Sequence, residues 1–221
     1  MLQAVLFDLD GTLLDRLSCL RVYLYGQVER LANDLHTLPF GEYMERVIEL
    51  DAHGHADKGK LFRRIERDFA LSPGTWQRLL DDFLTYFPHV CVPFPKAHQT
   101  LTTLRQQGLK MGLITNGAVD SQQPKIDGLG ISRYFDIILI SEAEGVAKPD
   151  AEIFRRATDN LGVSPDQAVM IGDNSEADIW GAKSFGMKAI WKRDEYWEAP
   201  EIVDAVIDDL DELPSAMHNL A

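Results

Sequence analysis

The chain has 221 residues, of which 45% are hydrophobic and 26% are charged, and its formal net charge at pH 7 is -13. These values are ordinary for a soluble globular protein, and the length suits one domain or a core domain with an insert. The acidity disfavours nucleic acid as a partner, since phosphate backbones need patches of Lys and Arg, and no apolar run approaches the roughly 18 residues of a membrane span.

Short apolar runs alternate with helical patterns along most of the chain. The first run, Gln3–Phe7, predicts a buried strand that ends in a turn. Later runs of the same character are 111–114, 135–140, 168–171, 189–191 and 205–207. Helical spacing covers 97–107, 151–161 and 177–185. This alternation predicts an α/β fold, in which helices cover both faces of a parallel sheet.

One region, from about Leu14 to Pro93, breaks the alternation and contains no convincing strand. Apolar residues recur there at helical intervals in four places, which predicts about four helices. Pro93 and Pro95 mark the return to the alternating pattern. We therefore expect a core made of residues 1–14 and 93–221, with an all-helical insert at residues 15–92.

Four short polar segments stand out against this pattern. They are Asp8–Thr12, Thr115–Gly117, Lys148–Pro149 and Gly172–Asp173. Three of them follow a predicted strand, at the end where open α/β sheets bind ligands. Each segment alone is a common turn or helix start. All four in this order are rarely met by chance, so we expect their loops to converge on one crevice.

The four segments resemble the motifs of the haloacid dehalogenase-like superfamily. The matching stretches are 7–13, 114–117, Lys148-Pro149 within 145–150, and 171–174 continuing to Asp178. The resemblance spans the chain from Gln3 to about Trp191. It implies a Rossmann-like parallel sheet, and it identifies the helical insert as a cap domain.

The resemblance also implies roles for individual residues. Asp8 is the nucleophile, and it forms an aspartyl-phosphate that water then hydrolyses. Asp10 protonates the leaving group and then deprotonates the attacking water. Thr115 and the Asn116 backbone donate hydrogen bonds to the phosphate, and Lys148 neutralises charge. The predicted function is hydrolysis of a phosphomonoester of a small metabolite, such as a nucleotide or flavin mononucleotide.

Magnesium is the predicted cofactor. A carboxylate that attacks a phosphate dianion is repelled by it, and Mg²⁺ relieves this repulsion while preferring oxygen ligands. By resemblance, Asp8 and Asp173 supply side-chain oxygens and Asp10 supplies its backbone carbonyl. Asp178 is either a partner that supports this site or an acid near a helix N-terminus. The sequence leaves that choice open.

A polar segment of the insert, residues 51–58, contains His53, His55 and Lys58. It is interpreted either as a solvated loop or as a loop that faces the substrate and sets specificity. Similar loops occur in family members that resemble nucleotide and flavin mononucleotide phosphatases. A metal site there is disfavoured, because no Cys and no clear third ligand accompany the two histidines.

Three alternative functions share the fold. A haloacid dehalogenase needs neither an acid at position 10 nor a metal, so Asp10 and Asp173 argue against it. A phosphomutase shares the motifs and differs in how long phospho-Asp8 survives water. A non-enzymatic binding module would have lost Asp8 or Asp10, and both are present.

Two further features bear on location and packing. Met1-Leu2-Gln3 carries no basic segment ahead of an apolar stretch, and Cys19 and Cys91 make no disulfide framework. We therefore expect a cytoplasmic protein with reduced thiols, and the sequence leaves its oligomeric state open. The tryptophans at 180, 191 and 197 are interpreted as packing residues.

Overall fold

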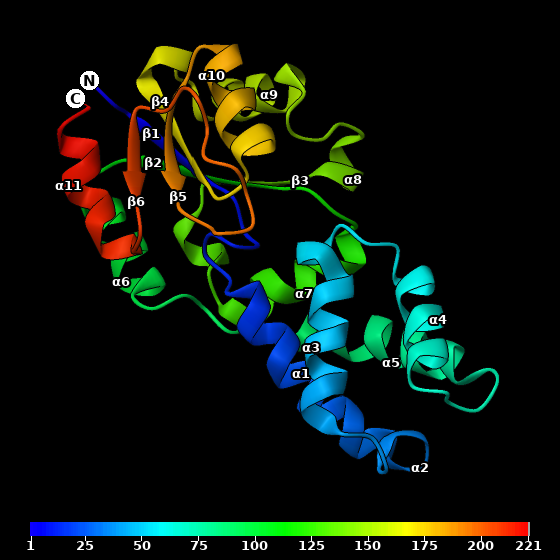
Figure 1. Ribbon diagram of the computed structural model, residues 1–221. Coiled ribbons are helices and arrows are strands. Elements are labelled where there is room, and N and C mark those ends of the chain that lie inside the picture. Colours follow the sequence, from blue (N-terminus) through cyan, green and yellow to red (C-terminus); the bar gives the residue numbers. More distant parts are fainter. Residues whose placement is uncertain (221) are drawn as a thin grey trace. The chain divides into compact units, whose positions relative to one another are not determined.

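The computed structural model describes residues 1–220 and divides into two compact units (Figure 1). One unit comprises Met1–Asp15 and Pro93–Ala221, and we call it the sheet unit. The other comprises Arg16–Val92, and we call it the helical unit. Among residues 1–220, no helix combines the length and the apolar character that crossing a membrane requires.

A single parallel sheet of six strands, in the order β3-β2-β1-β4-β5-β6, forms the centre of the sheet unit. The strands are β1 (Ala4–Phe7), β2 (Lys110–Thr115), β3 (Ile137–Ile140), β4 (Ala168–Gly172), β5 (Lys188–Lys192) and β6 (Ala205–Ile207). The predicted α/β fold with a Rossmann-like parallel sheet is confirmed. Because β1 lies between β2 and β4, the residues that follow these three strands emerge side by side.

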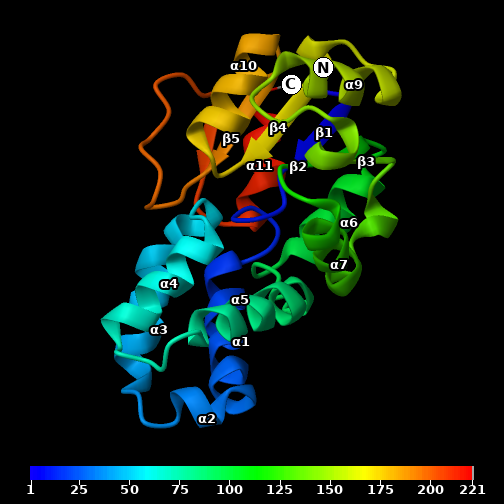
Figure 2. The ribbon, with the colours of Figure 1, turned by 90° about the vertical axis from the view of Figure 1, so that its right-hand side faces the viewer.

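Helices cover both faces of this sheet (Figure 2). They are α6 (Ala97–Gln106), α7 (Val119–Leu129), α8 (Ser141–Glu144), α9 (Ala151–Leu161), α10 (Gly181–Phe185) and α11 (Leu213–His218), with a π-helical turn at Ser175–Trp180 and 3-10 turns at Ser132–Tyr134, Pro165–Gln167 and Leu210–Glu212. Helix α9 packs with α10, and α6 packs with α11.

The core explains why the strands appear as continuous apolar runs in the sequence. In β1, Ala4 and Leu6 pack with Phe154 of α9 and Ala182 of α10. All four residues of β1 are fully buried, so its other two side chains are also enclosed. A strand buried on both faces cannot alternate between apolar and polar residues. The run of hydrophobic residues is therefore the expected signature of a central parallel strand.

The described elements of the helical unit are all helices. They are α1 (Arg16–Arg30), α2 (Ala32–Leu35), α3 (Phe40–Asp51), α4 (Lys58–Asp68) and α5 (Thr75–Tyr86), with 3-10 turns at Ala52–Gly54 and Phe87–His89. The four longer helices agree with the four predicted from hydrophobic spacing. Helix α2 is a single turn, too short for a periodic pattern to reveal it.

A buried polar network joins three helices of the helical unit. The Tyr23 hydroxyl donates to Asp82 Oδ1 at 2.7 Å, and the Tyr43 hydroxyl donates to Gln27 Oε1 at 2.7 Å. Gln27 Nε2 donates to the Tyr23 hydroxyl oxygen at 2.6 Å, and Arg30 binds Asp82 through two nitrogens at 2.7 and 2.9 Å. Such a network stabilises a fold only while each buried group keeps its partner.

We expect Asp82→Ala to lower the free energy of unfolding by about 2 kcal/mol, because the Tyr23 hydroxyl and the Arg30 guanidinium lose their acceptor. Urea titration followed by circular dichroism measures the change. Asp34→Ala is the matched control, since Asp34 forms a similar two-nitrogen pair with Arg78 on the surface. Equal losses in the two variants would contradict the importance of the buried network.

Candidate active site

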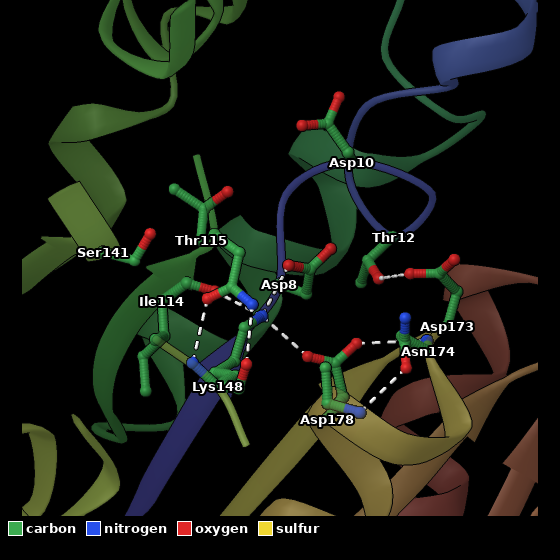
Figure 3. Close-up of polar contacts among 12 residues, drawn as sticks. Asp8, Asp10, Thr12, Ile114, Thr115, Ser141, Lys148, Asp173, Asn174 and Asp178 are labelled. Carbon is green, nitrogen blue, oxygen red and sulfur yellow. Dashed lines mark hydrogen bonds and ion pairs between the residues drawn. The ribbon is translucent and has the colours of Figure 1, made fainter. Parts of the chain in front are cut away.

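Three neighbouring strands place the candidate residues at one edge of the sheet. Asp8 follows β1, Thr115 is the last residue of β2, and Asp173 follows β4. Lys148 comes from the loop between α8 and α9 and reaches the same edge (Figure 3). The parallel registers align Phe7 with Leu113 and Ile171, so the three strands end nearly level.

The ammonium group of Lys148 lies at the centre of the site. Its Nζ donates to Asp8 Oδ1 at 2.6 Å, to Asp178 Oδ1 at 2.6 Å and to the Ile114 carbonyl at 2.8 Å. The side chains of Lys148 and Asp178 are 2% and 1% exposed. An ammonium has three donors, so one lysine can bind two buried carboxylates and a strand carbonyl at once.

Burial and charge shift the pKa values of these groups. Burial raises the pKa of Asp8 to about 7, against the opposing influence of Lys148. Burial also raises the pKa of Asp173, and the charges of Asp8 and Asp178 add to the effect. Burial alone would lower the pKa of Lys148, but Asp178 and Asp8 outweigh it and raise that pKa. Burial is thus the main cause of the raised pKa values of Asp8 and Asp173.

Three carboxylates form a compact group at this position. One oxygen from each of Asp8, Asp173 and Asp178 lies within 4.8 Å of the others. Oxygen atoms so arranged are the ligands that hard divalent cations prefer. Asp178, which the sequence left open, contacts Lys148 directly and also accepts a hydrogen bond from the Asn174 backbone N–H at 3.1 Å.

Asp173 is oriented by neutral donors. Trp197 Nε1 donates to its Oδ2 at 2.9 Å, and the Thr12 hydroxyl donates to its Oδ1 at 3.4 Å. Trp191 Nε1 donates to the Asp173 carbonyl at 2.6 Å. The interpretation of Trp191 and Trp197 as packing residues is therefore incomplete, because their indole N–H groups also fix the aspartate. Nothing in the linear pattern reveals these contacts.

Two glycines let the motifs approach one another. At Gly172, a Cβ atom would collide with the Asp178 carboxylate. At Gly11, with φ of +84°, a Cβ atom would lie 2.5 Å from Asp173 Oδ2. Gly11 also occupies the left-handed region that other residues rarely adopt. Both positions therefore require the absence of a side chain.

Asn116 positions Lys148 through the backbone of that residue. Its Oδ1 accepts from the Lys148 N–H at 2.9 Å, and its Nδ2 donates to the Lys148 carbonyl at 2.8 Å. The peptide bond between Lys148 and Pro149 is cis. The side chain of Asn116 thus fastens the loop that carries the central lysine to the end of β2. The sequence pointed to Asn116 for its backbone N–H and missed this second contact.

Asp10 meets two residues of α7, Gln122 and Lys125, that lie outside the four sequence motifs. Lys125 Nζ lies 2.9 Å from both carboxylate oxygens of Asp10, and Gln122 Nε2 donates to Oδ2 at 2.8 Å. The same Gln122 nitrogen donates to the Thr115 hydroxyl oxygen at 2.5 Å. The available signal was the spacing of Gln122 and Lys125, three residues apart on one helix face shortly after the second motif.

The remaining candidates, His53, His55 and Lys58, lie in the helical unit. Lys58 Nζ donates to the Gly54 and Ala56 carbonyls at 3.0 and 2.9 Å and pairs with Asp51 at 2.9 Å. These contacts of Lys58 therefore stabilise the conformation of the loop that precedes it. Both histidines are exposed, and His53 has a left-handed backbone with φ of 51°.

Comparison with known proteins identifies the family of this chain. The model of the haloacid dehalogenase-like (HAD-like) hydrolase family matches residues 2–186. The chain therefore belongs to this family, as the motif resemblance predicted.

Three similar proteins illustrate the family. A glyceraldehyde 3-phosphate phosphatase of Pyrococcus furiosus is 31% identical over 226 residues, which cover 96% of this chain and 91% of the relative. A HAD phosphatase structure from Thermococcus onnurineus is 29% identical, with a TM-score of 0.65 and 98% of each chain covered. A 2-haloacid dehalogenase structure from Pseudomonas syringae pv. Tomato DC3000 is 30% identical, with a TM-score of 0.63 over the whole of both chains. The chain is an enzyme of the HAD-like phosphatase class.

Proposed function

We propose that this enzyme is a Mg²⁺-dependent phosphomonoesterase that acts through an aspartyl-phosphate, an acyl phosphate formed on Asp8. The observation that carries the proposal is the buried pairing of Asp8 with Lys148 at 2.6 Å, next to the carboxylates of Asp173 and Asp178. Asp8 is thereby held at the end of the central strand with one oxygen bound by an ammonium group. This arrangement suits a carboxylate nucleophile that must approach an anionic substrate.

The reaction proceeds in two steps. Lys148 holds Oδ1 of Asp8, and Oδ2 attacks the phosphorus of the ester. The bond from phosphorus to the alcohol oxygen breaks, and Asp10 gives its proton to that oxygen. Water then attacks the phosphorus of phospho-Asp8, and Asp10 takes a proton from the water. Inorganic phosphate leaves, and the carboxylate of Asp8 is restored.

The residues present fit a bound Mg²⁺. Asp8, Asp173 and the Asp10 backbone carbonyl would hold it, since all are hard oxygen donors and one carboxylate oxygen of Asp8 lies within 4.8 Å of one of Asp173. When bound, the ion supplies positive charge that offsets the repulsion between nucleophile and phosphate. Asp178 serves as the charge partner of Lys148, because its two oxygens accept from Lys148 and from the Asn174 backbone.

The phosphate group of the substrate is bound by the Thr115 hydroxyl and the Asn116 backbone N–H, and the positive charge of Lys148 offsets part of its negative charge. The organic part is a small metabolite. The name of the Pyrococcus relative points to a triose phosphate, and the cap-loop resemblance points to a nucleotide or flavin mononucleotide. The phosphomutase alternative differs only in the fate of phospho-Asp8, and release of inorganic phosphate distinguishes the two.

Dehalogenation is the second candidate function, favoured by the similarity to the Pseudomonas dehalogenase structure. In that reaction Asp8 would displace halide from carbon, without a leaving-group acid or a metal ion. Asp10 and Asp173 argue against it, because that reaction needs neither an acid at position 10 nor a metal ion.

The helical unit is proposed to act as a cap that selects the substrate, while residues 1–14 and 93–221 form the catalytic core. Within the cap, the exposed His53 and His55 offer ring nitrogens to a substrate hydroxyl, base or second anion. Lys58 contributes by shaping this loop through its bonds to Gly54 and Ala56.

Asp8→Asn is expected to abolish turnover, because an amide is a far weaker nucleophile than a carboxylate. Phosphate release measures turnover, and intact-protein mass spectrometry after acid quench detects phospho-Asp8 in the wild type. An unchanged melting temperature provides the control for folding. Wild-type activity in this variant would refute the covalent mechanism.

Mg²⁺ is expected to raise the melting temperature of the wild type and to restore activity lost to chelation. At about 100 times its Kd, a bound ion stabilises the folded state by about 2.7 kcal/mol. Asp173→Asn should lose most of the thermal response, because one anionic ligand becomes neutral. Glu152→Gln, a change at an acid on the surface of α9, is the matched control and should keep it. A full response in Asp173→Asn would exclude the proposed ligand set.

His53→Ala and His55→Ala are expected to change the ranking of kcat/KM among phosphate esters, because each removes a polar contact to the leaving group. Both variants should still form phospho-Asp8 with a small generic ester. A panel of sugar phosphates, nucleotides and flavin mononucleotide measures the ranking. An unchanged ranking in both variants would identify the segment as an ordinary solvated loop.

A further inference from the structure

Two polar side chains of α7 are buried where a helix normally presents apolar residues. Gln122 is 2% exposed and Lys125 is 4% exposed, while Ile126 and Leu129 of the same helix pack into the core. Burial of an ammonium group costs several kcal/mol unless it is paired and hydrogen-bonded. An apolar residue at position 125 would satisfy packing alone, so packing does not account for the lysine.

The contacts of these two residues converge on Asp10. Lys125 Nζ binds both carboxylate oxygens at 2.9 Å and also donates to Gln122 Oε1 at 2.8 Å. Gln122 Nε2 donates to Asp10 Oδ2 at 2.8 Å and to the Thr115 hydroxyl oxygen at 2.5 Å. Together, Gln122 and Lys125 form what we call the α7 clasp. Its hydrogen bonds connect Asp10 of the first motif to Thr115 at the end of β2.

The α7 clasp holds the Asp10 carboxylate on the side of the site that faces away from Asp8. Figure 3 shows the carboxylate of Asp10 pointing away from Asp8 and Lys148. The compact acidic group consists of Asp8, Asp173 and Asp178, without Asp10. In phosphoryl transfer the attacking and leaving oxygens lie roughly in line on opposite sides of phosphorus. An acid for the leaving oxygen therefore has to be kept away from the nucleophile.

We infer that Lys125 and Gln122 are positioning residues that fix Asp10 for its acid and base steps. The inference rests on the proposed function, since it assigns Asp10 the leaving-group proton. A short side chain in a turn has several rotamers, and two donors from one rigid helix restrict it to one orientation. Such restriction lowers the entropic cost of reaching the reactive geometry. The bond from Gln122 to Thr115 ties this orientation to the residue that binds phosphate oxygens.

The test compares two substrates that differ in their need for an acid. An alkyl phosphate has a poor leaving group and depends on protonation, whereas 4-nitrophenyl phosphate depends on it much less. We expect Lys125→Met to lower kcat/KM about 10- to 100-fold for the alkyl ester and less than about 3-fold for the aryl ester. Lys125→Arg should recover much of the alkyl activity, because a guanidinium can also bind a carboxylate through two nitrogens.

Lys110→Met is the matched control. Lys110 is the first residue of β2, at the end of the strand opposite Thr115, and its Nζ donates to the Leu161 carbonyl at 2.5 Å. This variant should keep the wild-type ratio of alkyl to aryl activity, whatever its melting temperature. If Lys125→Met does not fold, Gln122→Leu keeps the lysine and tests the same selectivity.

Asp10→Asn distinguishes a failure of the positioning role from a failure of the acid role proposed for Asp10. If it is selective for the alkyl ester and the clasp variants lose activity equally on both esters, the clasp is structural and this inference is overturned alone. If Asp10→Asn itself shows no selectivity, the acid role of Asp10 fails and the inference falls with it. Selective loss in Asp10→Asn and in Lys125→Met, with recovery in Lys125→Arg, supports the positioning role.

Discussion

The contact of one buried ammonium group with two carboxylates determines how the rest of the site is built. Without Lys148, the carboxylates of Asp8 and Asp178 would be left buried without a counter-ion, which is strongly destabilising. The lysine comes from a loop rather than from a strand, so its backbone must be fixed independently. The side chain of Asn116 does this with one accepted and one donated hydrogen bond. A generic Thr-Asn-Gly turn after β2 thus becomes part of the electrostatic centre.

The second constraint is that the backbones that carry the charged groups must lie close together. It follows from the short contacts of Lys148 with the two carboxylates. Charges separated by 2.6 Å require the backbones that carry them to come together without intervening side chains. Gly172 makes room for Asp178, and Gly11 makes room for Asp173. The indole N–H groups of Trp191 and Trp197 then hold the Asp173 peptide and carboxylate from the other side. The two glycines therefore allow the charged groups to approach one another. The two tryptophans orient one of these groups.

The sequence was sufficient for the sheet and for the four motifs, because both depend on local patterns. Central strands appear as apolar runs, and three of the four motifs follow a strand directly. It was insufficient for Gln122 and Lys125, which lie more than a hundred positions from Asp10, because nothing in the linear pattern requires either residue to reach the site. Their burial depends on how α7 packs beside the first turn, which no local pattern encodes. The role of Asp178 was left open for the same reason.

Charge balance links the clasp, the central lysine and the expected cation. Lys148 contacts Asp8 and Asp178, and Lys125 contacts Asp10, so each ammonium group is already engaged by acidic residues of the protein. Asp173 accepts hydrogen bonds from the neutral donors Thr12 and Trp197. A phosphate dianion that enters this site adds charge of the same sign as the carboxylates of Asp8, Asp173 and Asp178. The Mg²⁺ ion that we propose would add positive charge close to Asp8 and Asp173 without disturbing either lysine.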